Sequence, residues 1–384
     1  MILYICVAFI SIILAYEISR RGKLAGIGTG YIENPVMLNS RARQYQRLCL
    51  ISVFVLLFAV SACRLNVGND YAKYVEFMHR LYTDAYIDDP GVPTEWGFNL
   101  LTRVIYALSG YENFLLVFAV YSFATVGIFL KAMWEQSEDF ALTFFMFMSL
   151  GYYFQSFSTV RYYLALAIAL YCMKLVMQKR WAAFIVMVLL GTGFHKSILV
   201  IVPLYLLASF AWKKWQLVIA LLLASTGLFL QDFYLKVVVK LYPSYEDTEY
   251  LDGSGLSLIN IARCAAVLIL AVICYKSQIQ GNRCMRFYFY MNLGALALYV
   301  FCSFLPIISR IGYYLTVSHI LFVPALLNGM ENKKLQRFMK IGVVIVCILY
   351  FAMYLMKASD DGVLVLPYRT FFFHDMVDIL SDVS

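Results

Sequence analysis

Three basic side chains stand at the ends of apolar segments, where charged residues are rare: Arg161, His195 and Arg310. A cation near hydrocarbon depth costs roughly 2.5–3.5 kcal/mol on insertion scales, so charged residues within a membrane mark functional sites by default. A guanidinium fork binds a phosphate through two hydrogen bonds and never deprotonates. A neutral histidine can accept a proton from a hydroxyl group. The three residues therefore predict a site that binds a diphosphate and activates a hydroxyl.

Each residue can also be interpreted as a structural residue with no catalytic or binding role. Arg161 and Arg310 could extend to ordinary lipid phosphates while their stems stay in the apolar region. His195 could be a buried histidine bonded to a carbonyl. Tyrosine pairs follow both arginines closely, Tyr162-Tyr163 and Tyr313-Tyr314, and this similar placement favours function.

A hydrophilic segment, 64–112, supplies carboxylates beside aromatic rings. Asp70 precedes Tyr71, and Glu95 precedes Trp96. Carboxylates accept hydrogen bonds from sugar hydroxyls and flat rings stack on pyranose faces, so this segment fits a glycan. The alternative is a solvated loop in which Asp70 and Glu95 only cap helices.

The elements that must position these residues are membrane-spanning helices. The chain of 384 residues is 62% hydrophobic and only 14% charged, with a mean hydropathy of +0.75. Soluble domains average about 25% charged residues, so the composition predicts an all-α polytopic membrane protein. About twelve apolar segments have a suitable length. They are 2–19, 48–63, 113–131, 140–157, 160–177, 181–195, 197–212, 215–232, 257–275, 286–305, 311–327 and 339–356.

The charges of the connecting segments predict the topology. When alternate loops are assigned to two sides, 19 of the 31 Lys and Arg fall on one side and 17 of the 23 Asp and Glu on the other. The basic side should be cytoplasmic. Both termini, the outer loops 64–112 and 233–256 and the tail 357–384 are then extracytoplasmic, with Arg161, His195 and Arg310 on the same side. Between 97 and 109 one apolar helical face fits a short helix on the membrane surface.

Several other classes of site are not indicated. The nine cysteines show no paired spacing, and no histidine or acidic motif predicts a metal site. No phosphate-binding glycine loop is present, so we expect neither a nucleotide nor another cofactor. The net charge of +8 follows from the cytoplasmic loops and does not point to nucleic acid.

The order and spacing of several short motifs, across nearly the whole chain, resemble the EpsG family. These are Wzy-like polymerases of bacterial exopolysaccharide, capsule and O-antigen clusters. The motifs are Arg64-x-x-x-Gly68-x-Asp70-Tyr71-x-x-Tyr74, Glu95-x-Gly97-Phe98, Arg161, Phe194-His195-x-Ser197, Arg310-x-x-Tyr313-Tyr314 and Pro367-Tyr368.

The resemblance implies an extracytoplasmic active site that joins lipid-linked oligosaccharide repeat units. It also implies a helical fold similar to the C-type glycosyltransferases of the O-antigen ligase and polymerase kind. The chain departs from the family near position 161, where Asn-x-x-Arg-Gln is frequent and Ser158 and Tyr162 stand here. A hydrogen-bonding partner of Arg161 is thereby lost.

These observations predict a single integral-membrane domain, 1–384, in a bacterial inner membrane, acting as a metal-independent glycosyltransferase without cofactor. It would take a polyprenyl-diphosphate-linked oligosaccharide and contact membrane lipids, with a chain-length regulator and a flippase of the same pathway as possible partners. The catalytic residues would be His195, Arg161 and Arg310, with Glu95 or Asp70 as alternative bases. The substrate-binding residues would be Arg64, Asp70, Tyr71, Glu95, Trp96, Tyr163 and Tyr314.

Three rival functions stay open at this point. A flippase or exporter of lipid-linked oligosaccharide would also need many helices and basic residues, but its site should lie near the midplane between matching halves. A membrane O-acyltransferase acting on sugars would use a histidine base but would not need paired arginines. A structural assembly partner would not depend on any of these residues individually.

Overall fold

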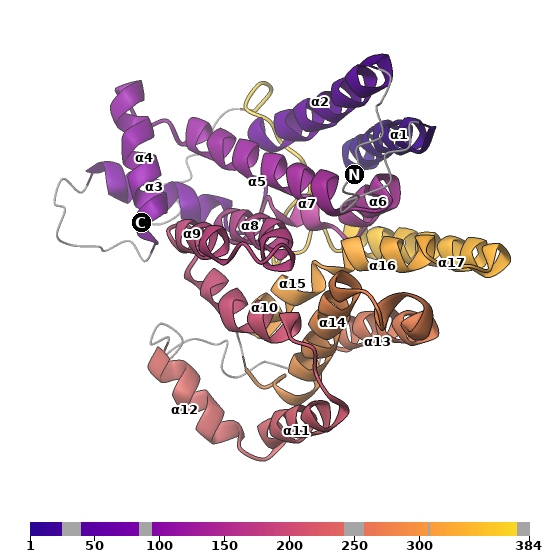
Figure 1. Ribbon diagram of the computed structural model, residues 1–384. Coiled ribbons are helices and arrows are strands. Elements are labelled where there is room, and N and C mark those ends of the chain that lie inside the picture. Colours follow the sequence, from indigo (N-terminus) through magenta and orange to yellow (C-terminus); the bar gives the residue numbers. More distant parts are fainter. Residues whose placement is uncertain (25–39, 84–93, 242–256, 306–307, 375–384) are drawn as a thin grey trace. The chain divides into compact units, whose positions relative to one another are not determined.

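A computed structural model describes residues 1–24, 40–83, 94–241, 257–305 and 308–374 (Figure 1). Within these ranges the regular structure is helical, and the only extended pairing is an isolated antiparallel bridge between Arg64 and Thr370. The prediction of an all-α polytopic membrane protein is therefore confirmed. Parts of the predicted outer loops (84–93 and 242–256) and the end of the tail (375–384) lie outside the described residues.

Seven of the described helical stretches are long and apolar enough to cross a membrane. They are Ile2–Arg20, Ala42–Ala62, Phe114–Gln136, Val160–Met177, Arg283–Phe301, Ile308–Asn328 and Lys333–Met356. The other five predicted spans fall on apolar helices of 10–17 residues, shorter than the roughly 20 residues that a bilayer requires. Twelve crossings are therefore not confirmed, and the count of helices with a full spanning length is seven in the described part of the chain.

The chain divides into two compact units, each described here by itself. Unit 1 comprises Met1–Cys172, Val186–Ile198 and Met330–Ser384; unit 2 comprises Met173–Ile185 and Leu199–Gly329. That the whole chain forms one integral-membrane domain stays a prediction.

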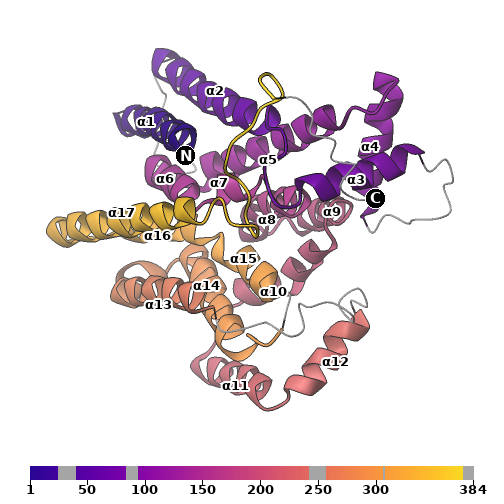
Figure 2. The same ribbon diagram turned by 180° about the vertical axis from the view of Figure 1, so that it is seen from behind.

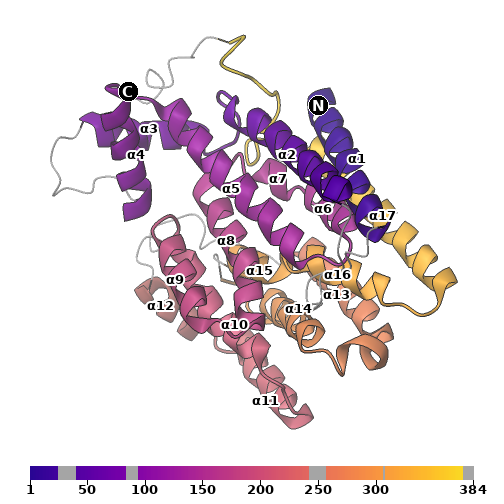
Figure 3. The same cartoon turned by 45° about the horizontal axis from the view of Figure 1, so that its top comes forward.

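Unit 1 is built around long apolar helices, several of which pack against helices that are distant in the sequence. α1 (Ile2–Leu24) lies against α2 (Ser40–Ala62) and α6 (Phe140–Ser149), and α2 also lies against α5 (Phe114–Gln136) (Figures 1 and 3). α17 (Lys333–Met356) returns to α6. The remaining elements of this unit are α3 (Tyr71–Thr83), α4 (Trp96–Ser109), α7 (Tyr152–Gln155), most of α8 (Val160–Met177), part of α9 (Trp181–Thr192) and the start of η1 (Lys196–Val200).

The predicted span 140–157 is interrupted between α6 and α7. Gly151 has φ +78°, a left-handed conformation that glycine adopts without strain, and it ends α6 after Leu150. The chain turns again before α8, so Arg161 lies in the first turn of a new helix and not inside a continuous one.

The C-terminal segment, residues 357–374, folds back onto the helices of unit 1, to which it belongs. Figure 2 shows it as an extended yellow strip that runs past α7 and α5. Its backbone carbonyls accept hydrogen bonds from the loop after α2: Leu65 N–Arg369 O at 3.0 Å, Gly68 N–Leu364 O at 2.7 Å and Asn69 N–Val363 O at 3.2 Å. These bonds fix the approach to α3.

Gly68 explains how this loop comes so close to the start of α8. Its φ is +108°, and a Cβ at this position would collide with the backbone of Phe157 and Ser158. Only a residue without a side chain satisfies both conditions. Ser158 itself donates a hydrogen bond to Val363 O at 2.9 Å, so loop, tail and the residues before Arg161 form one packed assembly.

Unit 2 consists of shorter helices around α14 (Arg283–Phe301). α10 (Ile201–Ser209), α13 (Leu258–Ile273) and α15 (Ile308–Thr316) each pack against α14. The other elements are α11 (Lys214–Ser225), η2 (Thr226–Leu228), α12 (Gln231–Leu241), the π-helical turn η5 (Tyr275–Ile279) and α16 (His319–Asn328).

Candidate functional site

Two glycines of unit 1 bring α4 and the α9–η1 turn into contact. Gly97 N donates to Gly193 O at 2.7 Å, and Phe98 N approaches the same oxygen at 3.3 Å. A Cβ on Gly97 would stand 2.5 Å from Gly193 O, and a Cβ on Gly193 would stand 2.8 Å from the indole of Trp96. Because neither glycine can carry a side chain without movement, this contact fixes how Glu95 and His195 approach each other.

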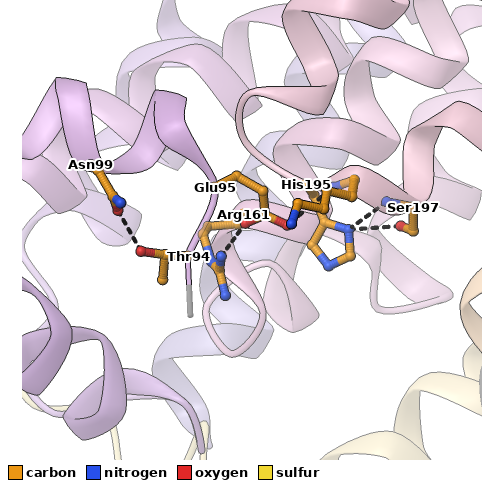
Figure 4. A network of polar contacts seen from close by, with 7 residues as sticks. Thr94, Glu95, Asn99, Arg161, His195 and Ser197 are labelled. Carbon is orange, nitrogen blue, oxygen red and sulfur yellow. Dashed lines mark hydrogen bonds and ion pairs between the residues drawn. The ribbon is translucent and has the colours of Figure 1, made fainter. Parts of the chain in front are cut away.

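Glu95 joins the two elements to α8 (Figure 4). One carboxylate oxygen, Oε1, accepts a hydrogen bond from Lys196 N at 3.1 Å. The other, Oε2, forms an ion pair with Arg161 Nη1. The Glu95 and Arg161 side chains are 11% and 15% exposed, so the pair is largely shielded but still reaches solvent.

Arg161 is held between aromatic rings as well as by its carboxylate. Its Cζ lies 5.4 Å from the ring centroid of Tyr74 and 5.5 Å from that of Phe98, within the range of cation–π attraction. Its Nε is buried and has no hydrogen-bond partner among the described residues. A buried donor without an acceptor costs about 1–3 kcal/mol. An oxygen of a bound anion would supply the missing acceptor.

Tyr74 adds a neutral phenol beside this guanidinium. Burial raises the pKa of the Tyr74 phenol, and the positive charge of Arg161 opposes this only in part. The ring therefore stays protonated at neutral pH, and it contributes its π face without a competing negative charge.

His195 is oriented by the turn that follows it. Its Nδ1 lies 2.7 Å from Ser197 Oγ and 3.3 Å from Ser197 N, whose proton points toward it. A backbone amide can only donate, so Nδ1 accepts and the neutral ring carries its proton on Nε2. The edge of the ring also lies against Tyr162, with centroids 5.4 Å apart. In this form Nε2 is a hydrogen-bond donor. The role of general base for His195 stays a prediction.

Thus three of the predicted residues, Glu95, Arg161 and His195, lie together in unit 1. Asp70, half-buried, precedes α3 in the loop that the C-terminal segment holds. Trp96 packs its indole on Gly193 yet is 61% exposed, as a glycan-stacking ring would need to be. Tyr163, in contrast, is 3% exposed and bonds to Gln155.

Arg64 lies in the core of unit 1. It is 1% exposed, and its Nη1 bonds to Ser61 O, to Ser61 Oγ at 3.0 Å and to Ser122 Oγ at 3.2 Å. Its Cζ lies 5.2 Å from the ring of Phe118, on which Tyr71 stacks. Burial lowers the pKa of Arg64 and raises that of Tyr71 to about 12. In this structure neither side chain presents a surface to a substrate.

Arg310 and Tyr314 belong to unit 2. Arg310 is exposed in the first turn of α15. Tyr314 is fully buried, and its carbonyl accepts a hydrogen bond from Tyr205 Oη at 3.1 Å. Tyr314 is therefore placed as a packing residue of α15.

The sequence interpretation did not include Arg263, an arginine within the apolar helix α13. It donates from Nη2 to Thr316 Oγ1 at 2.8 Å and lies 5.7 Å from the ring of Tyr313. The sequence did contain a signal for Arg263, because it is the single cation in the apolar helix Leu258–Ile273. The same reasoning selected Arg161.

Fold and composition define the class as a polytopic all-α membrane protein with several full-length spans. The sequence profile of the EpsG family matches residues 47–370, which is most of the chain. The chain belongs to the EpsG family, and this membership connects it with polysaccharide synthesis at a membrane. No curated protein and no solved structure matches it.

Proposed function

We propose that this protein is a polysaccharide polymerase that joins polyprenyl-diphosphate-linked oligosaccharide repeat units on the extracytoplasmic face of a bacterial cytoplasmic membrane. The observation that carries the proposal is the part-exposed Arg161, held by Glu95 and two rings, with one buried nitrogen that lacks an acceptor. Membership in the EpsG family supports the same class of reaction.

The reaction transfers the growing glycan from its carrier to a second lipid-linked unit. A hydroxyl oxygen at the non-reducing end of the acceptor bonds to the anomeric carbon of the donor. The bond between that carbon and the diphosphate oxygen breaks, its electron pair stays on the polyprenyl diphosphate, and the hydroxyl proton passes to a base. No oxidant or further reactant is required.

Arg161 would stabilise the charge that develops on the leaving diphosphate. Glu95 holds Nη1 and fixes the guanidinium before substrate arrives, so no reorganisation is needed when the bond breaks. Donors placed in this way contribute about 10²–10³ to the rate of comparable reactions.

Glu95 is the better candidate for the base. His195 carries its proton on Nε2 if its Nδ1 accepts from Ser197 N, and it would then donate a hydrogen bond to a phosphate or sugar oxygen. The Glu95 carboxylate already stands between Arg161 and Lys196 N. It would take the acceptor's proton on Oε1 while Oε2 stays on Arg161, so the guanidinium keeps its position. Trp96, exposed beside it, would stack on the sugar.

Analysis of the lipid-linked glycans in cells tests the proposal against a flippase. Cells that lack the protein should accumulate single repeat units on the polyprenyl carrier, accessible to a glycosidase added to the outer face, and should contain no polymer. Carrier-linked units that are trapped on the cytoplasmic face would instead identify a flippase and would refute the proposed reaction.

A further inference from the structure

Tyr121, on α5, places inside unit 1 a hydroxyl group that has no hydrogen-bond partner among the described residues. The residue is 1% exposed, and the centroids of the Phe98 and Phe194 rings both lie 5.9 Å from that of its own ring. Contacts between rings, and not a hydrogen bond, therefore fix the hydroxyl. A buried polar group without a partner costs about 1–3 kcal/mol. The hydroxyl thus destabilises the fold unless a bound molecule accepts its hydrogen bond.

The same rings place Tyr121 beside the ion pair of Arg161. Phe98 contacts both residues, because its ring centroid lies 5.9 Å from that of Tyr121 and 5.5 Å from the Cζ of Arg161. Phe194 directly precedes His195. The Tyr121 phenol is also close enough to Arg161 and Glu95 to interact electrostatically with both. The hydroxyl therefore belongs to the cluster that forms the candidate site.

This cluster lacks a hydrogen-bond acceptor. Arg161 Nε is buried without a partner, as is Tyr121 Oη. The two carboxylate oxygens of Glu95 are already held by Arg161 Nη1 and Lys196 N. A guanidinium N–H can only donate, and a phenol hydroxyl has one proton to donate. A phosphate oxygen can accept from both groups at once, and hydrogen bonds to an ionised oxygen are the strong ones.

We infer that Tyr121 is a further catalytic residue, whose hydroxyl donates to the same phosphate oxygen as Arg161 Nε. The inference rests on the proposed function, which identifies this phosphate as part of the leaving diphosphate. The hydrogen bond strengthens as the bond to the anomeric carbon breaks and its electron pair moves onto the diphosphate. The phenol keeps its proton throughout, so the step requires no additional acid or base.

The Tyr121→Phe variant of the full-length protein separates this role from a structural one. It keeps the contacts with Phe98 and Phe194 and removes only Oη. Because that hydroxyl has no partner among the described residues, the Tm should equal or exceed that of wild type. The transfer rate should fall about tenfold to a hundredfold, in kcat more than in KM, because the lost donor acts most strongly in the transition state.

Tyr106→Phe is the matched control. Tyr106, on α4, is 5% exposed and its hydroxyl also has no partner among the described residues. Its electrostatic neighbour is Glu112 and not Arg161. The control should shift the Tm in the same direction and leave the transfer rate unchanged. A folded Tyr121→Phe protein with the wild-type rate would overturn the inference and leave the proposed function intact.

A graded change of the hydroxyl covers the case in which Tyr121→Phe does not fold. Mono-, di- and trifluorotyrosine in place of Tyr121 keep the ring and the hydroxyl and make the donor progressively more acidic. The transfer rate should change steadily along this series. A rate that is independent of the acidity of the donor would overturn the inference.

Binding of inorganic pyrophosphate to the full-length protein in lipid nanodiscs gives a test that does not depend on polymer. Tyr121→Phe should weaken this binding about threefold to tenfold. In the background of Arg161→Lys, which keeps the charge but lacks Nε, the same substitution should weaken it less, because the two donors share one oxygen. Equal losses in both backgrounds would contradict the shared oxygen. Tyr121-dependent binding in a protein that forms no polymer would retain the site and refute only the proposed function.

Discussion

Arg64 and Arg161 are two arginines of unit 1 in similar aromatic surroundings but with different partners. Each guanidinium lies between 5.1 and 5.5 Å from two rings. Arg64 is 1% exposed and bonds to a carbonyl and to two serine hydroxyls. The Arg161 side chain is 15% exposed and forms an ion pair with a carboxylate.

The difference shows that two arginines with similar aromatic neighbours can have different access to solvent and different hydrogen-bond partners. The partners of Arg64 belong to α2 and α5, so its bonds hold helices together. The partner of Arg161 is Glu95, the residue before α4, which also accepts a hydrogen bond from the turn that carries His195. The Nε of both arginines is buried without an acceptor among the described residues. Solvent access is therefore what distinguishes Arg161, because the Arg64 site is closed.

Arg161→Gln should produce the largest effect on activity. Loss of the charge that stabilises the leaving diphosphate should lower polymer formation at least a hundredfold. The protein should still fold, because Arg161 sits at a helix end with part of its side chain exposed. Polymer length by gel electrophoresis and protein abundance in membranes by immunoblot give the two readouts. If this variant made as much polymer as wild type, Arg161 would have no catalytic role and would not differ from Arg64 in function.

Arg64→Met should give the opposite pattern. It keeps the volume but leaves Ser61 O without its donor, so we expect a loss of about 3 kcal/mol in the free energy of unfolding. Thermal unfolding of the purified protein should show a lower Tm, and activity per folded molecule should stay within about threefold of wild type. A stable but inactive Arg64→Met protein would contradict the structural role.

Gly97→Ala should reduce activity about tenfold. The new Cβ would stand 2.5 Å from Gly193 O, so α4 must move and Glu95 loses its position relative to Arg161. The matched control is Gly342→Ala in α17, where a Cβ would meet nothing within 4 Å. Transfer rates measured on membranes with equal amounts of each protein provide the comparison. Equal rates for both variants would show that the glycine contact does not position the site.

His195→Gln should have the smallest effect, about threefold, because the glutamine amide can place a donor near the position of Nε2. His195→Ala, which removes the donor, should lower the rate about tenfold or more. The ratio of the two rates identifies the role of the ring. Equal and severe losses in both variants would restore the general-base role and argue against the tautomer deduced from Ser197 N.

The sequence predicted that Arg161, His195 and Arg310 lie on one side of the membrane, because charges are rare in apolar segments, and it named Glu95 separately as a substrate-binding residue or alternative base. Of these residues, Glu95, Arg161 and His195 lie together in unit 1. It did not predict the burial of Arg64, since a motif gives a residue's position in the chain but not the serines and rings that surround it. Arg263 was missed because the family motifs do not include it, although it met the same physical criterion. The break at Gly151 depends on a left-handed glycine, which hydropathy cannot detect.

The most direct test of the central claim is the reaction of the purified protein in proteoliposomes with one lipid-linked repeat unit as its only substrate. Mass spectrometry would follow the carrier-linked products and the released polyprenyl diphosphate. We predict a ladder of carrier-linked glycans with one released polyprenyl diphosphate for each added unit, absent with Arg161→Gln. Movement of the unaltered substrate across the bilayer with no longer glycan would contradict the account.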